Sequence, residues 1–149
     1  MEMPTLIPIE TRDDIPAHYA DTPIGLLLEY HNLKRPHEGH ESAQLLAGMC
    51  MDSRKHLHIP ENFAFVLRAG GANFRSNEFK ISFAVAVGGV SHVALIGHTQ
   101  CGMVDLQSRK LQFIDGLVER AGWRPEKAEA HFEINVSTFE IGKEIDFIL

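Results

Sequence analysis

The chain has 149 residues, of which 44% are hydrophobic, and this length predicts one domain, residues 1–149, with a substantial core. A formal net charge of −6 argues against nucleic acid and anionic membranes as partners, because both bind basic surfaces. Because the sequence shows neither a signal peptide nor an apolar run of about 18 residues, we expect a cytoplasmic protein whose two cysteines are thiols or metal ligands.

The first 42 residues are predicted to form an irregular arm, a helix and a polar loop. Residues 1–22 contain three prolines and few apolar repeats, which is typical of an extended arm. Thr22 and Pro23 have the residue types of a helix cap and a first helical position, so a short amphipathic helix is expected over 24–33. The polar segment 34–42 predicts a loop.

Three apolar segments predict strands, and a helical pattern lies between the second and the third. The strands are expected at 44–50, 63–68 and 92–97. The helix over about 77–87 is apolar on most faces, which predicts deep burial. Strands separated by helices predict parallel β-α-β units, so the fold class is α/β, with a central, mostly parallel sheet flanked by helices.

The last third of the chain begins with a predicted helix over 112–122 that ends at a break in 122–125. The segment 137–149 also has apolar residues at helical spacing, namely Ile141, Ile145 and Ile148.

Reactive side chains follow two of the predicted strands. Cys50 closes the first strand, and His98 and Cys101 close the third. The carboxyl ends of parallel strands line one crevice, where two thiolates and an imidazole would suit tetrahedral Zn²⁺ and leave its fourth position open. The alternative for either cysteine alone is packing in the core, where free cysteines are common.

Asp52 and Arg54 alternate with Cys50 along the chain. Near a metal, the Asp52 carboxylate would either bind the ion itself or orient the attacking hydroxide. A pair with Arg54 would hold the carboxylate away from the ion. The alternative for this pair is a surface salt bridge that contributes little to stability.

Other histidines and a glycine-rich segment have weaker patterns. His37 and His40 have His-x-x-His spacing but lie in a predicted loop without a third ligand, which favours solvated side chains. His56 and His58 either relay protons or lie on the surface. Residues 68–73, RAGGAN, lack the Gly-x-Gly-x-x-Gly spacing of a nucleotide site and predict a tight turn near the crevice.

The motif Cys-x-Asp-x-Arg at 50–54, followed by His-x-x-Cys-Gly at 98–102, resembles the motif pair of the β-class carbonic anhydrases. The resemblance covers about residues 45–103 and is greatest to the compact bacterial and archaeal branch. Arg68 and Gly71 also match the family's Arg-Asn-Ala-Gly segment, although Ala and Gly stand between them in place of Asn and Ala.

The resemblance implies a zinc lyase (a carbonate dehydratase) that interconverts CO2 and bicarbonate by a metal-bound hydroxide. Cys50, His98 and Cys101 would bind Zn²⁺. Asp52 would orient the hydroxide or, in an inactive form, become the fourth ligand, and Arg54 would pair with it. The implied pocket positions are Arg68, Gly71 and Gly102. Gly102 would also allow a close approach of the backbone beside the last ligand.

The family generally assembles as dimers or larger, so the resemblance also implies a homodimer or higher homo-oligomer. The C-terminal strand of the family is expected to be missing from this chain. Two other functions stay open on the same residues: hydrolysis of carbonyl sulfide or carbon disulfide at the zinc site, and a non-catalytic zinc-binding structural or regulatory role.

Overall fold

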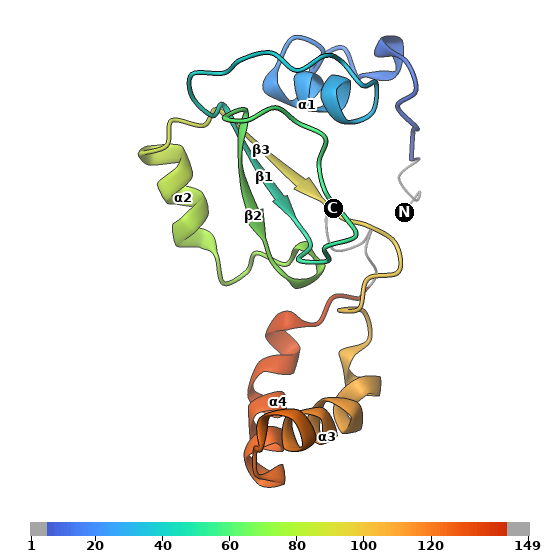
Figure 1. Cartoon of the computed structure of the whole chain (residues 1–149), viewed down its shortest axis with the longest axis vertical. Helices are drawn as coiled ribbons and strands as arrows, with labels where there is room; N and C mark the ends of the chain where they lie inside the picture. Colours follow the sequence, from blue (N-terminus) through green and yellow to red (C-terminus); the bar gives the residue numbers. More distant parts are fainter. Residues whose placement is uncertain (1–5, 143–149) are drawn as a thin grey trace. The chain divides into compact units, whose positions relative to one another are not determined.

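A computed structural model describes residues 6–142 of the chain (Figure 1). In chain order its helices and strands are η1 (Arg12–Asp14), α1 (Pro23–His31), β1 (Leu45–Met49), β2 (Ala64–Arg68), η2 (Gly70–Ala72), α2 (Glu78–Ala86), β3 (His92–Ile96), η3 (Leu106–Arg109), α3 (Lys110–Ala121) and α4 (Pro125–Phe139).

The described residues cluster into two compact units. Unit 1 holds residues 6–48, 53–67 and 78–94, and unit 2 holds residues 49–52, 68–77 and 95–142. Unit 1 therefore contains α1, α2 and most of the three strands, while unit 2 contains the strand ends, the loops that follow them and the last two helices. The expectation of a single domain stays a prediction.

The three strands form one parallel sheet in the order β2-β1-β3, which confirms the predicted α/β class. Each strand lies within its predicted range, shorter by one residue at one or both ends. All five residues of the central strand β1 are buried. This burial explains its unbroken apolar sequence, since a parallel strand covered on both faces has no polar side.

The helix α1 begins as the sequence predicts. The Thr22 side chain accepts hydrogen bonds from the N–H groups of Ile24 and Gly25, and Pro23 occupies the first turn. Farther along α1, the buried Glu29 carboxylate binds Arg12 at 3.1 Å and Arg35 at 2.6 Å. These ion pairs attach both the N-terminal segment and the loop after α1 to the same helix.

The deep burial predicted for α2 is wrong. Within α2, Ala84 alone is buried, and it packs with Leu46 and Val90. On the outer side, Phe79 is 80% exposed and Phe83 54% exposed. An apolar pattern on most faces of a helix predicts burial only if other residues cover each face. No described residue covers the face of α2 that carries Phe79 and Phe83.

The helices α3 and α4 form a hairpin in unit 2, and α4 has no counterpart among the predicted helices. Gly122 ends α3 in the left-handed conformation, at φ +66°, and Pro125 begins α4. Lys110 of α3 bridges Glu129 and Glu133 of α4 at 2.8 and 2.6 Å. The predicted break at 122–125 is therefore the turn of this hairpin.

The helix suggested by isoleucine spacing in 137–149 is present only at 137–139, the end of α4, and is wrong at 140–142. The helix α4 ends at Phe139, and Ile141 instead forms a parallel bridge with Val104. Ile145 and Ile148 lie outside the described residues. Because Ile141 is 1% exposed, burial against the loop after β3 and not helical periodicity explains its apolar side chain.

Candidate metal centre

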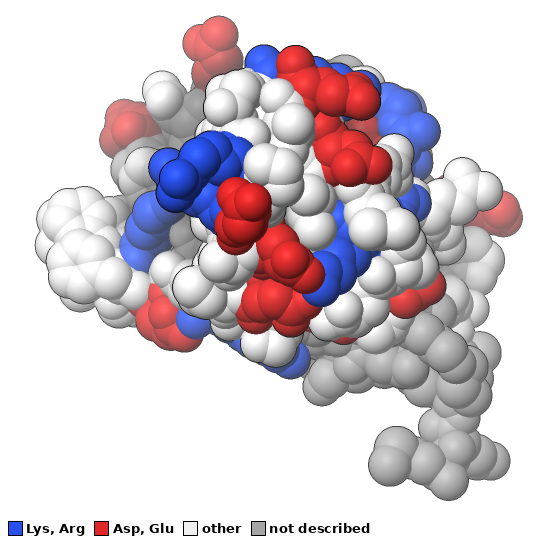
Figure 2. Space-filling view, turned by 90° about the horizontal axis from the view of Figure 1, so that it is seen from below, with Lys and Arg blue, Asp and Glu red and all other residues white. Residues whose placement is uncertain are grey.

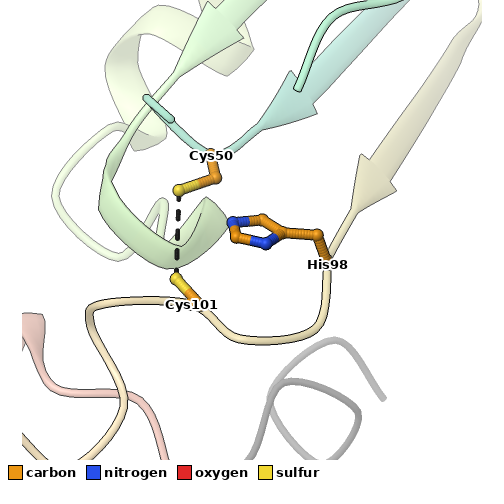
Figure 3. A group of neighbouring side chains, drawn as sticks. All are labelled: Cys50, His98 and Cys101. Carbon is orange, nitrogen blue, oxygen red and sulfur yellow. Dashed lines mark hydrogen bonds between the residues drawn. The ribbon is translucent and has the colours of Figure 1, made fainter. Parts of the chain in front are cut away.

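Cys50 follows the last residue of β1 and is buried (Figure 3). Arg68, the last residue of β2, fixes the backbone around it. The Arg68 Nη1 atom donates to the carbonyl oxygens of Cys50 at 2.9 Å and of Asp52 at 3.3 Å. The chain that leaves β1 is therefore tied to the end of the neighbouring strand.

A tight turn at η2 brings a backbone N–H group to the Cys50 sulfur. Gly71 has φ +66°, a conformation that glycine adopts without strain, and its N–H donates to Cys50 Sγ at 3.3 Å. A Cβ atom at Gly71 would lie 2.9 Å from Ile141 Cδ1 and 3.1 Å from Met103 Cβ. The predicted turn at 68–73 is confirmed, and both conformation and space require glycine at its centre.

The surroundings of Cys50 favour its thiolate. Burial alone would raise the pKa of this thiol, but hydrogen bonds with the Asp52 N–H, His98, the Gly71 N–H and Cys101 outweigh burial and lower the pKa to about 7. A thiol must lose its proton to bind a metal, so the lowered pKa makes Cys50 a better ligand near neutral pH.

His98 lies two residues beyond the end of β3, and its ring is oriented by the backbone. Its Nδ1 atom lies 2.7 Å from the Thr99 carbonyl oxygen, which can only accept, so Nδ1 carries the proton and donates. The Nε2 atom is buried and, in Figure 3, points toward the two sulfurs. Metal-ligating histidines are commonly oriented in this way, with one ring nitrogen held by a carbonyl and the other turned toward the metal.

The three donor atoms have the spacing of one metal ion. The sulfurs of Cys50 and Cys101 lie 3.9 Å apart, and all three ligand atoms lie within 4.8 Å of one another. Two sulfurs bound tetrahedrally to zinc at about 2.3 Å are about 3.8 Å apart. Within residues 6–142, this is the one group of three or more Cys, His, Asp or Glu residues with such spacing. The donor set therefore fits zinc.

Apolar side chains pack around the two cysteines. Cys50, Cys101 and Ile141 form one buried cluster, and Met103 and Val104 contact it. This packing withdraws the sulfurs from solvent, which strengthens the electrostatic interactions of the thiolates. Nothing in the sequence identified Ile141 as part of this site, because it lies 40 residues after Cys101.

Two further predicted site residues, Asp52 and Arg54, follow Cys50 in the chain. Asp52 is half-buried and reaches Cys50 through its backbone, while Arg54 lies in an exposed turn that follows. Their catalytic roles stay predictions. The close backbone approach expected at Gly102 is wrong, because a Cβ there would meet no atom within 4 Å. Its place in a substrate pocket stays a prediction.

The fold and the donor set define an α/β protein with a candidate Cys-His-Cys metal centre beyond the ends of its parallel strands. The sequence matches the family model described as carbonic anhydrase over residues 46–140, more than half of the 149 residues. The chain therefore belongs to the β-class carbonic anhydrase family, as its motifs predict. A search of curated proteins finds no match.

Neither helix length nor composition points to a bilayer. Across the part of the chain that the structure describes, no helix has the length and apolar character that spanning a membrane requires. The cytoplasmic location stays a prediction.

Proposed function

We propose that this protein is a zinc-dependent carbonate dehydratase that interconverts CO2 and bicarbonate. One observation carries the proposal: Cys50, His98 and Cys101 present three suitably spaced donors in a chain of the carbonic anhydrase family. When bound, zinc would acidify a water molecule and so supply the nucleophile for CO2 near neutral pH. Three protein donors leave one position for that water, as in other catalytic zinc sites.

The chain's own groups prepare the donors for this reaction. The N–H groups of Gly71 and Asp52 stabilise the Cys50 thiolate, and the Thr99 carbonyl fixes the tautomer of His98. These partners belong to the backbone, so they hold the donors in place without flexible side chains. The donor set thus needs little rearrangement to bind the ion.

We assign the orienting role to the Asp52 carboxylate, as the family resemblance implies. In this role Asp52 accepts a hydrogen bond from the nucleophile, so that a lone pair faces CO2, and Arg54 holds the carboxylate ionised and away from the metal. The half-buried position of Asp52 two residues after Cys50 supports the assignment. In a non-catalytic protein, Asp52 would instead bind the metal as its fourth ligand.

Metal content tests the donor set. We expect one zinc per chain by elemental analysis after dialysis that removes weakly held ions. The variant Cys101→Ser loses this zinc because a serine hydroxyl is a poor zinc ligand. Asp115→Asn, on the exposed side of α3, is the matched control and keeps its zinc. Full zinc occupancy in Cys101→Ser would refute the assignment.

Stopped-flow CO2 hydration, measured across pH beside carbonyl sulfide hydrolysis, tests the reaction. We expect hydration by the zinc-loaded protein, and a loss of about tenfold or more in Asp52→Asn with zinc retained, a typical effect of removing a group that guides proton positions. Asp115→Asn keeps the parent rate. Zinc-loaded protein that is inactive at every pH would support the non-catalytic alternative, and turnover of carbonyl sulfide alone would identify the other hydrolase.

We further propose that a second copy of the chain covers part of unit 1, as the resemblance implies. Exposed apolar side chains on α2 and β2 support this proposal, including Phe79, Phe83, Val85, Phe65 and Val66. Isolated exposed apolar residues are common, but a cluster of this kind marks an interaction surface. Light scattering after gel filtration should give at least twice the monomer mass of 16.7 kDa. A monomer at micromolar concentration would contradict the proposal.

The charge distribution is consistent with a small-molecule substrate. Figure 2 shows basic and acidic side chains interleaved on the face that it draws, with no extended basic patch there. Nucleic acids bind surfaces dominated by lysine and arginine. The mixed charges on this face and the net charge of −6 thus both favour CO2 and bicarbonate over a polyanion as the partner.

A further inference from the structure

Unit 1 brings together five histidines from three segments that are distant in sequence. His31 ends α1, His37 and His40 lie in the loop before β1, and His56 and His58 lie in the loop before β2. None of them belongs to the Cys-His-Cys centre. Imidazole is the commonest metal ligand among side chains, so each pair within this cluster is a candidate donor set.

Two of these rings have a spacing suited to a shared ion. The ring centres of His37 and His58 lie 4.5 Å apart, and their planes are tilted by 42°. A metal–nitrogen bond is about 2.1 Å long, and the ring centre lies about 1.1 Å beyond the nitrogen. If two imidazoles bind one ion at an angle of about 90°, their ring centres are therefore about 4.5 Å apart. A shared ion must lie in both ring planes, which the tilt permits and a parallel stack would not.

Buried groups position the loop that carries His37. Tyr30 is fully buried, and its ring meets His37 edge-on at 5.7 Å and His40 at 5.9 Å. The Tyr30 hydroxyl also binds His40 Nε2 at 2.9 Å, so that nitrogen is already used. His40 could therefore reach a metal ion only through its Nδ1 atom.

The loop that carries His58 is attached to α1. The backbone N–H of His58 donates to His31 Nδ1 at 3.1 Å, which holds this loop beside the last turn of the helix. Burial, and next the charge of Lys34, lower the pKa of His31, so His31 stays neutral as an acceptor near pH 7. The side chain of His58 is thus placed by its backbone, and its ring is exposed beside that of His37.

The nearby charges are mixed, since the charge of Lys34 acts on His31 while that of Arg35 is paired with carboxylates. Arg35 pairs with Glu29 at 2.6 Å and with Glu38 at 3.0 Å, so its positive charge is compensated within the cluster. We propose that His37 and His58 form a second metal site for an imidazole-binding divalent ion such as Ni²⁺, Cu²⁺ or Zn²⁺, with water completing its coordination. Two exposed imidazoles bind such ions more weakly than the Cys-His-Cys donors bind zinc, because they offer fewer and neutral ligands.

Isothermal titration of the zinc-loaded protein with Ni²⁺ tests this site. We expect one Ni²⁺ per chain, and an affinity at least tenfold lower in His37→Ala and in His58→Ala. Both side chains are exposed, so these variants should fold, which their circular dichroism melting curves check. His18→Ala and His131→Ala, at exposed histidines outside the cluster, are the matched controls and bind as the parent does.

A second measurement separates this site from the cysteine centre. In Cys101→Ser the Ni²⁺ site should persist, and substoichiometric Cu²⁺ should broaden the proton resonances of His37 and His58 before those of other histidines. The proposal is overturned if the parent binds no Ni²⁺ beyond its zinc, if His37→Ala and His58→Ala bind like the parent, or if Cys101→Ser abolishes Ni²⁺ binding.

Discussion

Replacing Gly71 by alanine tests whether one backbone conformation supports the metal centre. At φ +66° an L-residue costs about 1–2 kcal/mol relative to glycine. The new methyl group would lie 2.9 Å from Ile141 Cδ1, and Ile141 is 1% exposed and has little space to move. Overpacking of this kind costs about 1–3 kcal/mol, so we expect the free energy of unfolding to fall by about 2–5 kcal/mol in total.

The substitution Gly71→Ala should also lower the affinity for zinc. Relieving the contact with Ile141 moves the Gly71 N–H away from Cys50 Sγ, which it meets at 3.3 Å. Urea unfolding of the metal-free and zinc-loaded proteins measures both effects, because the stabilisation by zinc grows with the logarithm of its affinity. We expect Gly71→Ala to have a lower midpoint in both forms and a smaller gain from zinc than the parent.

Gly102→Ala is the matched control. Gly102 is adjacent to Cys101, but a Cβ there meets no atom within 4 Å. The free energy of unfolding of Gly102→Ala should therefore stay within about 0.5 kcal/mol of the parent. If Gly71→Ala unfolds like the parent, or if both glycine variants lose the same stability, the requirement for glycine at position 71 is refuted.

Two further predictions concern single polar side chains. Asn73 is 3% exposed and donates to the Thr138 carbonyl at 2.8 Å, so Asn73→Ala should cost about 1–3 kcal/mol in urea unfolding, while Gln112→Ala, at an exposed position of α3, costs less than about 0.5 kcal/mol. Burial, and then nearby positive charges, lower the pKa of His31 below its unfolded value near 6.5, so the folded state disfavours protonation. Above about pH 6.5, His31 therefore causes no loss of stability, and the loss grows as the pH falls from there through the folded pKa of His31. The melting temperature of His31→Asn should depend less on pH below about pH 6.5 than that of the parent.

The sequence identified the strands and the metal donors because both signals are local. The buried strand β1 shows as five consecutive apolar residues, and β2 and β3 have four apolar residues each beside Arg68 and His92. Cys50, His98 and Cys101 follow two strand ends, and parallel strands place those ends together whatever the rest of the chain does. The donor set could therefore be predicted before any contact was known.

The groups that hold the donors in place could not be predicted in the same way. The Gly71 N–H and the Thr99 carbonyl act through the backbone, and every residue except proline has both groups. Ile141 contacts the cysteines after a helical hairpin that the sequence pattern did not reveal. Which backbone group or distant side chain reaches a donor depends on the path of the chain, and residue type does not encode that path.

The wrong prediction for α2 has a different physical origin. Its apolar pattern is strong, and the sequence correctly predicted a helix here. Within α2, however, Ala84 alone is buried against the described chain. A single chain buries one face of a helix against its sheet, so apolar residues on the opposite face have to be covered by something else. Phe79 and Phe83 lie one turn apart on that opposite face, with ring centres 6.4 Å apart, and form a continuous apolar surface. If a second copy of the chain covers this face, as proposed above, the apolar face of α2 is buried in the dimer, and replacing Phe79 by serine should lower the mass measured by light scattering while leaving the fold of the monomer stable.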